Sequence, residues 1–283
     1  MNKVKILADS TADLSPELYK KHDIDRVYCS VSFGEKVYID TIDITLEELY
    51  ANVKKVGSLP HTAAVPPTDF EEYFKKQIEA GFDVVYVGLG SKLSTTFQNA
   101  HIAAQSCPEG RVFLVDSDSL SSGIGLLVMK ACKFRDEGLS AKEIAEKCQA
   151  LAPKIIAQFT VESLDYLHKG GRCSGASKLI GHIFHVHPYL RMVDGKLIVY
   201  KKPRGTSKMA IDEQIKGFKE DLPNVELDNI MITHAGLDKD LEDYFYAEVK
   251  KLVPDANINI TRAGATIASH CGYGTVGLLY IKK

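Results

Sequence analysis

The sequence predicts an α/β protein built from two domains. Short apolar segments alternate with capped helices over the first half of the chain, a pattern typical of a parallel sheet with helices on both faces. The second half contains the turn signal Asp194-Gly195 between two alternating segments, which predicts a β-hairpin and therefore a mixed α/β domain. The pattern changes near Ala152-Pro153, so we place the domains at residues 1–153 and 154–283.

The first domain is predicted to alternate strands and helices. The strands are apolar runs bounded by polar turns, at residues 4–8, 27–33, 84–87 and 112–115. Each helix begins after a residue that can cap its free N–H groups. In chain order these capping residues are Ser15 (before Pro16), Thr45, Thr68, Ser94, Ser121-Ser122 and Ser140. Glutamates three positions after Thr45, Thr68 and Ser140 complete capping boxes, and Gly57 and Gly81 end the second and third helices.

The second domain is predicted to mix strands, helices and one hairpin. A strand at 155–159 leads to a short helix at 163–168, which Gly170-Gly171 ends. The hairpin strands lie at 188–193 and 196–201. The remaining elements are helices at 206–220 and 238–252 and strands at 230–234, 258–261 and 276–281. The last strand could pair with either domain.

Composition and targeting signals narrow the class of protein. The 283-residue chain carries a net charge of −2, whereas nucleic-acid-binding proteins usually show a basic excess. Its six cysteines are scattered without a C-x-x-C motif, which favours reduced thiols in a cytoplasm over a disulfide framework. The N-terminus lacks a signal-peptide core, and no apolar run approaches the ~20 residues of a membrane span. We therefore expect a cytoplasmic protein with no nucleic-acid partner and no stable membrane insertion.

Three short segments combine a hydroxyl or imidazole side chain with a loop marked by glycine or proline. Such loops can bring short hydrogen-bond donors together around an anionic head group. None carries the carboxylate cluster or Cys/His spacing typical of an acid–base enzyme or a metal site, so we expect no catalytic residue, metal or cofactor. The sequence first indicates a protein that binds an acid. The segments are Leu59-Pro60-His61-Thr62, Leu93-Ser94-Thr95-Thr96 and His270-Cys271-Gly272-Tyr273-Gly274.

Two other motifs have a plainer structural explanation. Residues 272–277 match G-x-G-x-x-G, but only a strand-like segment follows them, without room for the βαβ unit of a dinucleotide site. Their glycines more simply allow the backbone to pass close to a ligand or to a partner helix. His182, His185 and His187 are spaced too loosely for a metal site and lack further ligands.

Six of the basic residues in the first half of the second domain make it locally basic. A solvated surface is the ordinary explanation for such charges. The sharper hypothesis is a docking surface for an acidic partner or a phosphate. These residues are Lys169, Arg172, Lys201, Lys202, Arg204 and Lys208.

Taken in chain order, a set of patches resembles the DegV family. Each patch alone is weak, but together they span the whole chain in the order of the family. The patches are Ala8-Asp9-Ser10-Thr11-Ala12-Asp13-Leu14, Pro60-His61-Thr62, the stretch 93–100 (LSTTFQNA), Val115-Asp116-Ser117, the stretch 163–172 (SLDYLHKGGR), Arg204 with Lys208, and His270-x-Gly272-x-Gly274.

The resemblance implies both a fold and a function. DegV-like proteins have an N-terminal Rossmann-like parallel-sheet domain and a C-terminal mixed α/β domain, with a ligand tunnel between them. They bind one long-chain fatty acid in that tunnel. The well-understood members are the fatty-acid-binding subunits (FakB) of bacterial fatty acid kinase. They hold the acid while a separate ATP-dependent kinase subunit phosphorylates its carboxylate, and the acyl phosphate feeds phospholipid synthesis.

The resemblance also implies roles for particular residues. The family's carboxylate-binding threonine, serine and histidine match Thr62, Ser94 and His270, and the arginine matching Arg204 contacts the head-group region in some members. Neighbouring ligand contacts are expected from Thr95, Gly272 and Gly274. The arginine matching Arg172 is associated with the kinase-facing side, where Lys169 also falls.

The chain departs from the family pattern at three places. Family members often have Ser-Gln-Pro after the threonine, where this chain has Ala63-Ala64-Val65-Pro66. They usually have glycine at the position of Thr95, and many have Pro-Gly where this chain has Tyr273-Gly274. We expect Tyr273 to narrow or reshape the mouth of the pocket. These departures concern the preferred acyl chain more than the fold.

Two alternatives to a kinase subunit remain open. The first is a serine esterase or other hydrolase that uses Ser94 and His270, although no G-x-S-x-G motif surrounds Ser94 and no acid is obviously placed behind His270. The second is a lipid carrier that acts without any kinase.

Overall fold

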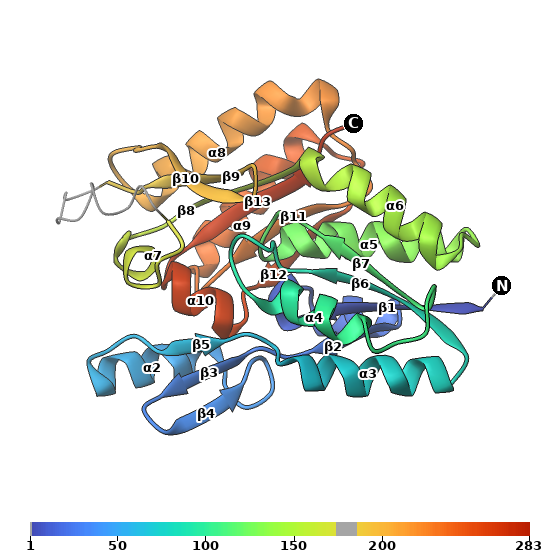
Figure 1. The fold of residues 1–283 in the computed structure, drawn as a ribbon. Coiled ribbons are helices and arrows are strands. Elements are labelled where there is room, and N and C mark those ends of the chain that lie inside the picture. The colour runs from blue at the N-terminus through green and yellow to red at the C-terminus, as the bar shows by residue number, and fades with distance from the viewer. Residues whose placement is uncertain (1, 174–185) are drawn as a thin grey trace.

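The computed structural model describes residues 2–173 and 186–283 (Figure 1). His182 and His185 lie outside the described residues. None of the described helices is long and apolar enough to cross a membrane.

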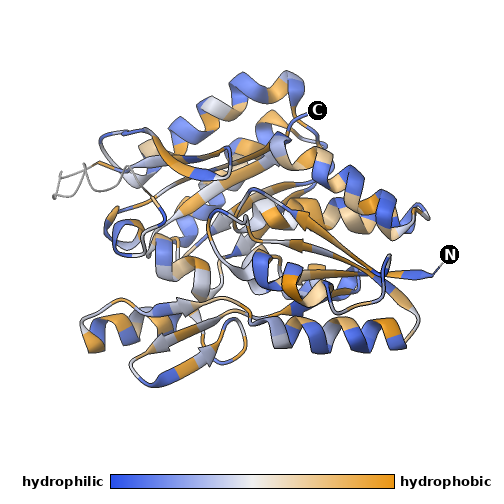
Figure 2. Cartoon of the chain, in the orientation of Figure 1, coloured by the Kyte–Doolittle hydropathy of each residue, from blue (hydrophilic) through white to orange (hydrophobic). Residues whose placement is uncertain are grey.

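The first domain is built on a parallel four-stranded sheet with the strand order β2-β1-β6-β7. Alternate residues of β1 face opposite sides: Ile6 packs with α1, α5 and α6, and Leu7 packs with α3 and α4. The strands are therefore apolar on both faces, as Figure 2 shows for β6 and β7. The elements are β1 (Lys3–Asp9), α1 (Pro16–Lys21), β2 (Ile24–Val27), α3 (Pro67–Glu79), β6 (Phe82–Gly88), α4 (Thr96–Ala104), β7 (Val112–Asp116), α5 (Ser122–Asp136) and α6 (Ala141–Leu151).

The second domain is built on a mixed six-stranded sheet with the strand order β10-β9-β8-β13-β11-β12. Its outer face packs against α8 and α9, and part of its inner face packs against α5, which therefore lies between the two sheets (Figure 1). The last strand, β13, pairs with β8 and β11, so it belongs to the second sheet. The elements are β8 (Ile155–Thr160), α7 (Asp165–Lys169), β9 (Tyr189–Val193), β10 (Lys196–Lys201), α8 (Ser207–Asp221), β11 (Ile230–His234), α9 (Lys239–Leu252), β12 (Ile258–Arg262), α10 (Ala265–Cys271) and β13 (Val276–Ile281).

A third, antiparallel sheet of three strands comes from the first half of the chain but packs on the second. Val31 of this sheet shares a hydrophobic cluster with Leu167 and Ala268, so residues 28–64 reach across to α7 and α10. This sheet and α2 form the lower left part of the molecule in Figure 1, beside α3. The elements are β3 (Ser30–Phe33), β4 (Lys36–Ile39), α2 (Leu46–Val56) and β5 (His61–Ala63). Short 3₁₀ turns complete the chain at Ser10–Ala12, Ala152–Lys154 and Leu222–Asn224.

Most of the predicted caps and turns are confirmed. Ser15 accepts a hydrogen bond from the backbone N–H of Leu18, and both Thr45 and Ser140 form capping boxes with the glutamates that follow. Gly57 ends α2 with φ of 73°. Asp194 and Gly195 have φ of 50° and 69°, the two positive values that a tight hairpin turn needs.

Four predicted elements are wrong in detail. The strand expected at 27–33 breaks into β2 and β3, which belong to different sheets. The helix expected to begin after Thr68 begins one residue earlier than Thr68, at Pro67. Proline suits the first position of a helix because the N–H group that it lacks would have no partner there. The hydroxyl of Thr68 donates a hydrogen bond to the carboxylate of Asp69 and does not cap the helix. The helix expected after Ser94 begins at Thr96, with Thr95 at the N-cap position. Helix α10 was not predicted, and its last two residues, His270 and Cys271, were placed in a loop.

Candidate functional site

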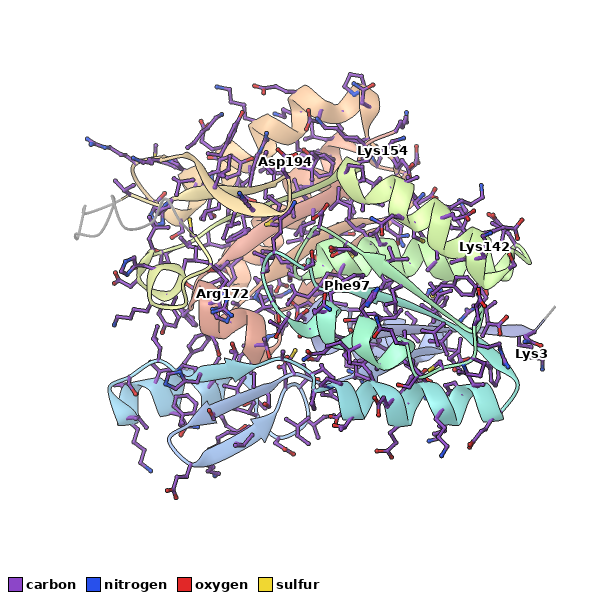
Figure 3. All side chains as sticks on the ribbon, viewed as in Figure 1. Lys3, Phe97, Lys142, Lys154, Arg172 and Asp194 are labelled. Atoms are coloured by element: carbon purple, nitrogen blue, oxygen red, sulfur yellow. The ribbon has the colours of Figure 1, made fainter. Side chains whose placement is uncertain are left out.

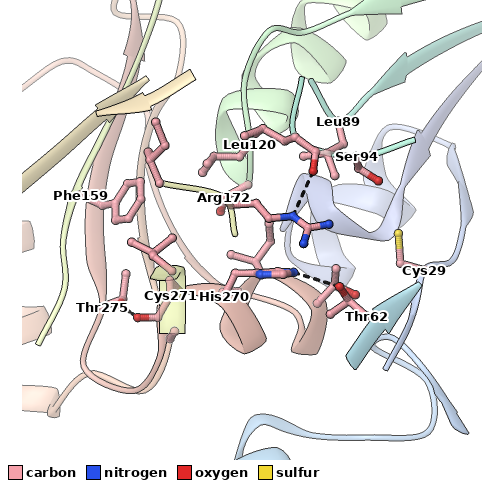
Figure 4. Close-up of a pocket in the computed structure, with 18 of the residues that line it drawn as sticks. Cys29, Thr62, Leu89, Ser94, Leu120, Phe159, Arg172, His270, Cys271 and Thr275 are labelled. Atoms are coloured by element: carbon pink, nitrogen blue, oxygen red, sulfur yellow. Dashed lines mark hydrogen bonds between the residues drawn. The ribbon is translucent and has the colours of Figure 1, made fainter. Parts of the chain in front are cut away.

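A cavity of about 430 Å³ lies between the two domains (Figure 4). The first domain contributes the loop after β6 and strand β5, and the second contributes α10 and the inner face of strands β8, β11 and β13. Most of the exposed wall area is apolar, and Thr62, Ser94, Thr95, Arg172 and His270 supply polar side chains to it. The aliphatic residues in the wall are Ala63, Ala64, Leu89, Leu93, Leu120, Leu167, Leu197, Ala235, Ala263, Ile267 and Leu279.

Thr62 and His270 meet directly in the wall of this cavity. The Oγ1 atom of Thr62 lies 2.9 Å from Nε2 of His270 (Figure 4). Thr62 is held by the pairing of β5 with β3, where it lies opposite Val31. His270 lies in the last turn of α10, which packs against the same small sheet. The side chains that the resemblance predicts to share a ligand therefore come from opposite ends of the chain.

Ser94 and Thr95 also line the cavity, at the start of α4. The Oγ of Ser94 accepts a hydrogen bond of 3.2 Å from the backbone N–H of Thr96 and lies 3.0 Å from its Oγ1. Ser94 thus acts as a local turn residue just before the helix rather than as its N-cap. Thr96 is fully buried and lies outside the cavity wall. The polar side of the cavity therefore receives two hydroxyl groups from this loop.

Arg172 is exposed to solvent and at the same time lines the cavity (Figures 3 and 4). Its Nε donates a hydrogen bond of 3.3 Å to the carbonyl of Leu93, and its Nη1 donates to the carbonyl of Gly170. The side chain therefore reaches from the end of α7 to the loop of the first domain that carries Ser94. A positive charge is thereby placed at the polar side of the cavity, where solvent also has access.

Lys92 is a second cation in the cavity wall, and the sequence analysis missed it. Its Nζ donates to the carbonyl of Asp194 at 2.8 Å and lies 3.7 Å from the carboxylate of Asp118. The turn of the β9–β10 hairpin is thus held against the loop of the first domain. Glycine occupies the neighbouring turn position, Gly195, because φ there is 69°, and this leaves room for Asp118 and Lys92 to pass close to the turn.

The imidazole of His270 is electrically neutral near neutral pH. Burial, with a smaller contribution from the charge of Arg172, lowers the pKa of His270 from 6.5 to about 4. Its Nδ1 is buried, lies close to the backbone at Gly170 and has no hydrogen-bond partner among the described residues. Only Nε2 is available to Thr62 or to a ligand. With its proton on Nε2, this ring can donate a hydrogen bond to a carboxylate without adding a second buried charge.

Two buried aspartates of the first domain hold the beginning of α10. Asp13 accepts hydrogen bonds from the backbone N–H of Gly264 at 2.8 Å and from the hydroxyl of Ser121 at 2.6 Å. Asp40 accepts from the N–H of Thr266 at 3.3 Å and from the hydroxyl of Ser10 at 2.8 Å. Burial raises the pKa of both carboxyl groups. The helix that carries His270 is therefore positioned by residues that are far away in the sequence.

A third buried aspartate holds the loop on the other side of the cavity. Asp9 accepts 2.8 Å hydrogen bonds from the hydroxyl of Tyr86 and from the N–H of Leu89, which lines the cavity. Asp9 caps the 3₁₀ turn, through the N–H of Thr11, and also makes these long-range contacts.

Several predicted site residues lie away from the cavity wall. Arg204 lines a separate basic depression instead. Lys169 is exposed at the end of α7 and does not line the cavity. The residues of the depression are Lys201, Lys202, Pro203, Arg204, Met209 and Glu213.

Gly272 and Gly274 were expected to contact the ligand, but in the structure they lie close to other residues of the protein. Gly272 and Gly274 have φ of 82° and 78°, and neither lines the cavity. A Cβ on Gly272 would lie 2.9 Å from the ring of Tyr166, and one on Gly274 would lie 2.7 Å from Glu162. The glycines therefore let this turn pass close to α7 and the segment before it, which is the second of the two explanations given for them.

Tyr273 covers the outside of the protein and not the mouth of the cavity. Its ring packs edge to face against Tyr50, with ring centres 5.4 Å apart, and lies over Gly236. It is 55% exposed and is absent from the cavity wall. The expectation that Tyr273 shapes the pocket is therefore not met by its position.

The geometry does not form the hydrogen-bonded Ser–His pair of a hydrolase. Among the described residues, the Nε2 of His270 is engaged by Thr62, whereas the Oγ of Ser94 is engaged by Thr96. The buried Nδ1 of His270 has no acid beside it in this part of the chain. The G-x-G-x-x-G match leads into strand β13 and not into a helix, so the dinucleotide mechanism lacks its helix N-terminus.

His187 is the one member of the histidine group within the described residues. Its Nδ1 lies 3.3 Å from Glu162, and its Nε2 lies 3.2 Å from the carbonyl of Gly205. Both ring nitrogens therefore have partners within the protein. Across residues 2–173 and 186–283, no group of three or more His, Cys, Asp or Glu side chains is arranged to hold a metal ion.

The fold and the site together define an α/β protein with a parallel-sheet domain, a mixed-sheet domain and a mainly apolar cavity that also contains hydroxyl, imidazole and guanidinium groups. The sequence profile of the DegV family, described as a family of uncharacterised proteins, matches residues 3–283. The chain therefore belongs to the DegV family.

Relatives of known sequence or structure cover the chain from end to end. A DegV domain-containing protein from Clostridium perfringens is 30% identical over 285 residues, which is 100% of both chains. The structure titled fatty acid binding of a DegV family protein from Thermus thermophilus matches with a TM-score of 0.91 at 29% identity, over 100% of both chains. A stearic-acid-binding protein from Eubacterium ventriosum matches with a TM-score of 0.84 at 28% identity, over 100% of this chain and 99% of the other. The predicted family and fold class are confirmed.

Proposed function

We propose that this protein binds a long-chain fatty acid in the cavity between its domains. The observation that carries the proposal is the composition of the cavity wall, in which Thr62, Ser94 and His270 provide hydrogen-bonding groups and most of the remaining exposed surface is apolar. The relatives from Thermus thermophilus and Eubacterium ventriosum, whose structures are described as fatty-acid-binding, support the same ligand class.

The free energies of burying a carboxylate and an acyl chain are consistent with a wall that has both polar and apolar parts. A buried carboxylate is costly unless several donors hydrogen-bond to it, and the two hydroxyls and the neutral imidazole can supply those bonds. Each buried methylene group contributes roughly 0.8 kcal/mol. The acyl chain therefore supplies most of the affinity, and the polar groups fix the orientation of the acid.

We further propose that the carboxylate is presented to a separate ATP-dependent kinase, which converts it to an acyl phosphate for phospholipid synthesis in the cytoplasm. The support is the position of Arg172, which faces both the polar side of the cavity and the solvent. A guanidinium there can neutralise charge on a transferred phosphoryl group through paired N–H donors. The protein itself then acts as the non-catalytic, substrate-carrying subunit.

The basic residues outside the cavity suit an acidic surface of this partner. Lys169 is exposed two residues after the buried Leu167 of α7, and the depression around Arg204 contains two more lysines. Lys201 is paired with Glu213 at 3.2 Å. Such exposed charges act mainly on the rate and specificity of docking, and less on its strength.

A reconstituted reaction tests the proposal and separates its alternatives. The protein is loaded with a fatty acid and mixed with the candidate kinase and ATP, and acyl phosphate is trapped with hydroxylamine as the hydroxamate. The kinase-subunit role predicts hydroxamate only when all three components are present. Binding without any product would leave the kinase-independent carrier, and hydrolysis of acyl esters by the protein alone would favour the esterase.

A further inference from the structure

Two glycines follow helix α7, and only the second is required by its backbone conformation. Gly171 has φ of 70°, in the left-handed region that favours glycine at the end of a helix. Gly170 has φ of −73° and ψ of −12°, which are ordinary right-handed values that other residues adopt equally well. The end of the helix therefore explains Gly171 and gives no local reason for glycine at position 170.

The imidazole of His270 occupies the space where a side chain at position 170 would lie. A Cβ atom on Gly170 would lie 2.4 Å from Nδ1 of His270 and 3.1 Å from its Cε1. Both atoms belong to a rigid ring, so the whole ring would have to move to make room for a methyl group. The absence of a side chain at Gly170 is therefore what lets the imidazole pack directly against the backbone.

Helices α7 and α10 pack against each other around this contact. Leu167 of α7 and Ala268 of α10 share one hydrophobic cluster. A second ring packs against a second glycine, since a Cβ on Gly272 would lie 2.9 Å from the ring of Tyr166. Each helix thus carries a ring that packs against a glycine just after the end of the other helix. The imidazole is therefore held against α7 as well as being carried by α10.

The backbone that Nδ1 faces is already engaged in other hydrogen bonds. The N–H of Gly170 donates to the carbonyl of Tyr166 at 2.9 Å, and the carbonyl of Gly170 accepts from Nη1 of Arg172. A proton on Nδ1 would be a buried donor without an acceptor among the described residues, whereas a proton on Nε2 can be donated to Thr62 or to a ligand (Figure 4). The packing at Gly170 thus favours the tautomer with its proton on Nε2.

We propose that Gly170 is a positioning residue of the carboxylate site, because the absence of a side chain there holds the imidazole of His270 against α7 with its Nε2–H directed toward Thr62 and the head group of the ligand. The inference rests on the proposed fatty-acid function. The carbonyl of Gly170 also anchors the guanidinium of Arg172, which lines the same cavity. One residue without a side chain therefore contacts two of the polar groups that the cavity offers to a ligand.

The first test is a double-mutant cycle on fatty-acid affinity. Dissociation constants for palmitate are measured by displacement of a fluorescent fatty acid. Gly170→Ala should raise the constant at least about tenfold, because the displaced ring loses its hydrogen bond to the charged carboxylate. His270→Ala has no ring to displace, so adding Gly170→Ala to it should change the constant by less than about twofold. Only an effect that acts through the imidazole gives this difference.

Gly217→Ala is the matched control. Gly217 lies in α8 without a positive φ, and a Cβ there would lie 3.0 Å from Nη2 of Arg191, so it is a crowded glycine of the same domain outside the cavity wall. Its substitution should leave palmitate affinity unchanged. If Gly170→Ala does not fold, the double variant with His270→Ala decides the matter. It should fold, since the ring that the added methyl group meets is gone, and a double variant that stays unfolded would overturn the inference.

The tautomer of His270 is measured independently by ¹⁵N NMR of protein labelled at histidine, which distinguishes a protonated ring nitrogen from an unprotonated one. The spectrum of His270→Gln identifies the signals of this residue among the nine histidines. The parent should carry its proton on Nε2 at neutral pH, and Gly170→Ala should shift both nitrogens toward the average of the two tautomers.

Three results would overturn the inference and leave the fatty-acid function intact. They are palmitate affinity of Gly170→Ala within about twofold of the parent, an equal loss of affinity in the His270→Ala background, and a proton on Nδ1 in the parent. A parent protein that binds no palmitate would instead refute the proposed function.

Discussion

The Nε2 atom of His270 lies 2.9 Å from the Oγ1 atom of Thr62, although 208 positions separate the two residues in the chain. Thr62 comes from the small sheet of the first domain and His270 from helix α10 of the second. The contact exists only when the small sheet and α10 are docked together. The polar side of the cavity is therefore a product of the tertiary fold, and it can be perturbed either at the two side chains or at the residues that position α10.

Replacing Thr62 by valine should weaken fatty-acid binding without unfolding the protein. Valine keeps the branched shape that suits strand β5 but removes the hydroxyl. A hydrogen bond to a charged group is worth about 1.5–3 kcal/mol, so the dissociation constant should rise about 10- to 150-fold. Ser94→Ala should behave in the same way. The methyl ester of the same acid is the control, since its neutral head group should lose less in each variant. Unchanged affinity of both variants for the free acid would place the head group elsewhere.

The unfolding free energy of the lipid-free protein should depend on pH through His270. The pKa of His270 is about 4 in the folded protein against 6.5 for a free side chain, so the unfolded chain takes up the proton first. Stability should therefore fall as the pH is lowered from about 6.5 to about 4, and His270→Gln should lack this part of the decline. Urea denaturation across this range measures both proteins. The raised pKa values of Asp13 and Asp40 affect the pH dependence of the unfolding free energy in the same way in both proteins. The difference between the two proteins therefore reports on His270. Parallel curves would contradict the assignment.

Asp13→Ala should destabilise the protein and disturb the head-group site. The change leaves the N–H of Gly264 and the hydroxyl of Ser121 without their buried partner, at about 1–3 kcal/mol for each unsatisfied group. Asp13→Asn is the matched control, because its carbonyl can still accept from Gly264 and its amide can donate to Ser121. Chemical denaturation and fatty-acid binding are measured on both variants. The account fails here if the asparagine variant is as damaged as the alanine variant.

Arg172→Ala should retain the bound fatty acid but lose most acyl phosphate formation when kinase and ATP are added. Affinity should persist because the acyl chain supplies most of it, whereas the transferred phosphoryl group loses its paired N–H donors. Arg172→Lys should recover only part of the activity, since lysine offers a point charge without the planar fork. Lys169→Ala, which removes an exposed cation outside the cavity wall, should lose less. A variant that sheds its lipid, or one that supports phosphorylation at the parent rate, would refute this role.

Local signals in the sequence were sufficient for most of the elements. Caps such as Ser15, Thr45 and Ser140 and the turn at Asp194-Gly195 depend on neighbouring residues only, and these predictions are confirmed. The β3–β4 hairpin was missed although Gly34 lies in its turn with φ of 59°, because both strands are only four residues long and β4 is largely exposed. A glycine between two short alternating segments was the signal that could have revealed it.

The site depended more on long-range structure. The meeting of Thr62 with His270 followed from the family resemblance and not from spacing, since nothing local links β5 to α10. Asp40 was missed because its partners, Ser10 and Thr266, lie 30 and 226 positions away. Gly272 was expected near the ligand because glycine permits another group to approach the backbone closely. The sequence does not identify that group, and in the structure it is the ring of Tyr166.

Native mass spectrometry of the purified protein tests the central claim most directly. The protein is purified from cells without added lipid, and its intact mass is compared before and after organic extraction. The account predicts a mass excess that corresponds to one long-chain fatty acid per chain, which extraction removes and which added fatty acid restores. A protein that carries no lipid and gains none when fatty acid is supplied would contradict it.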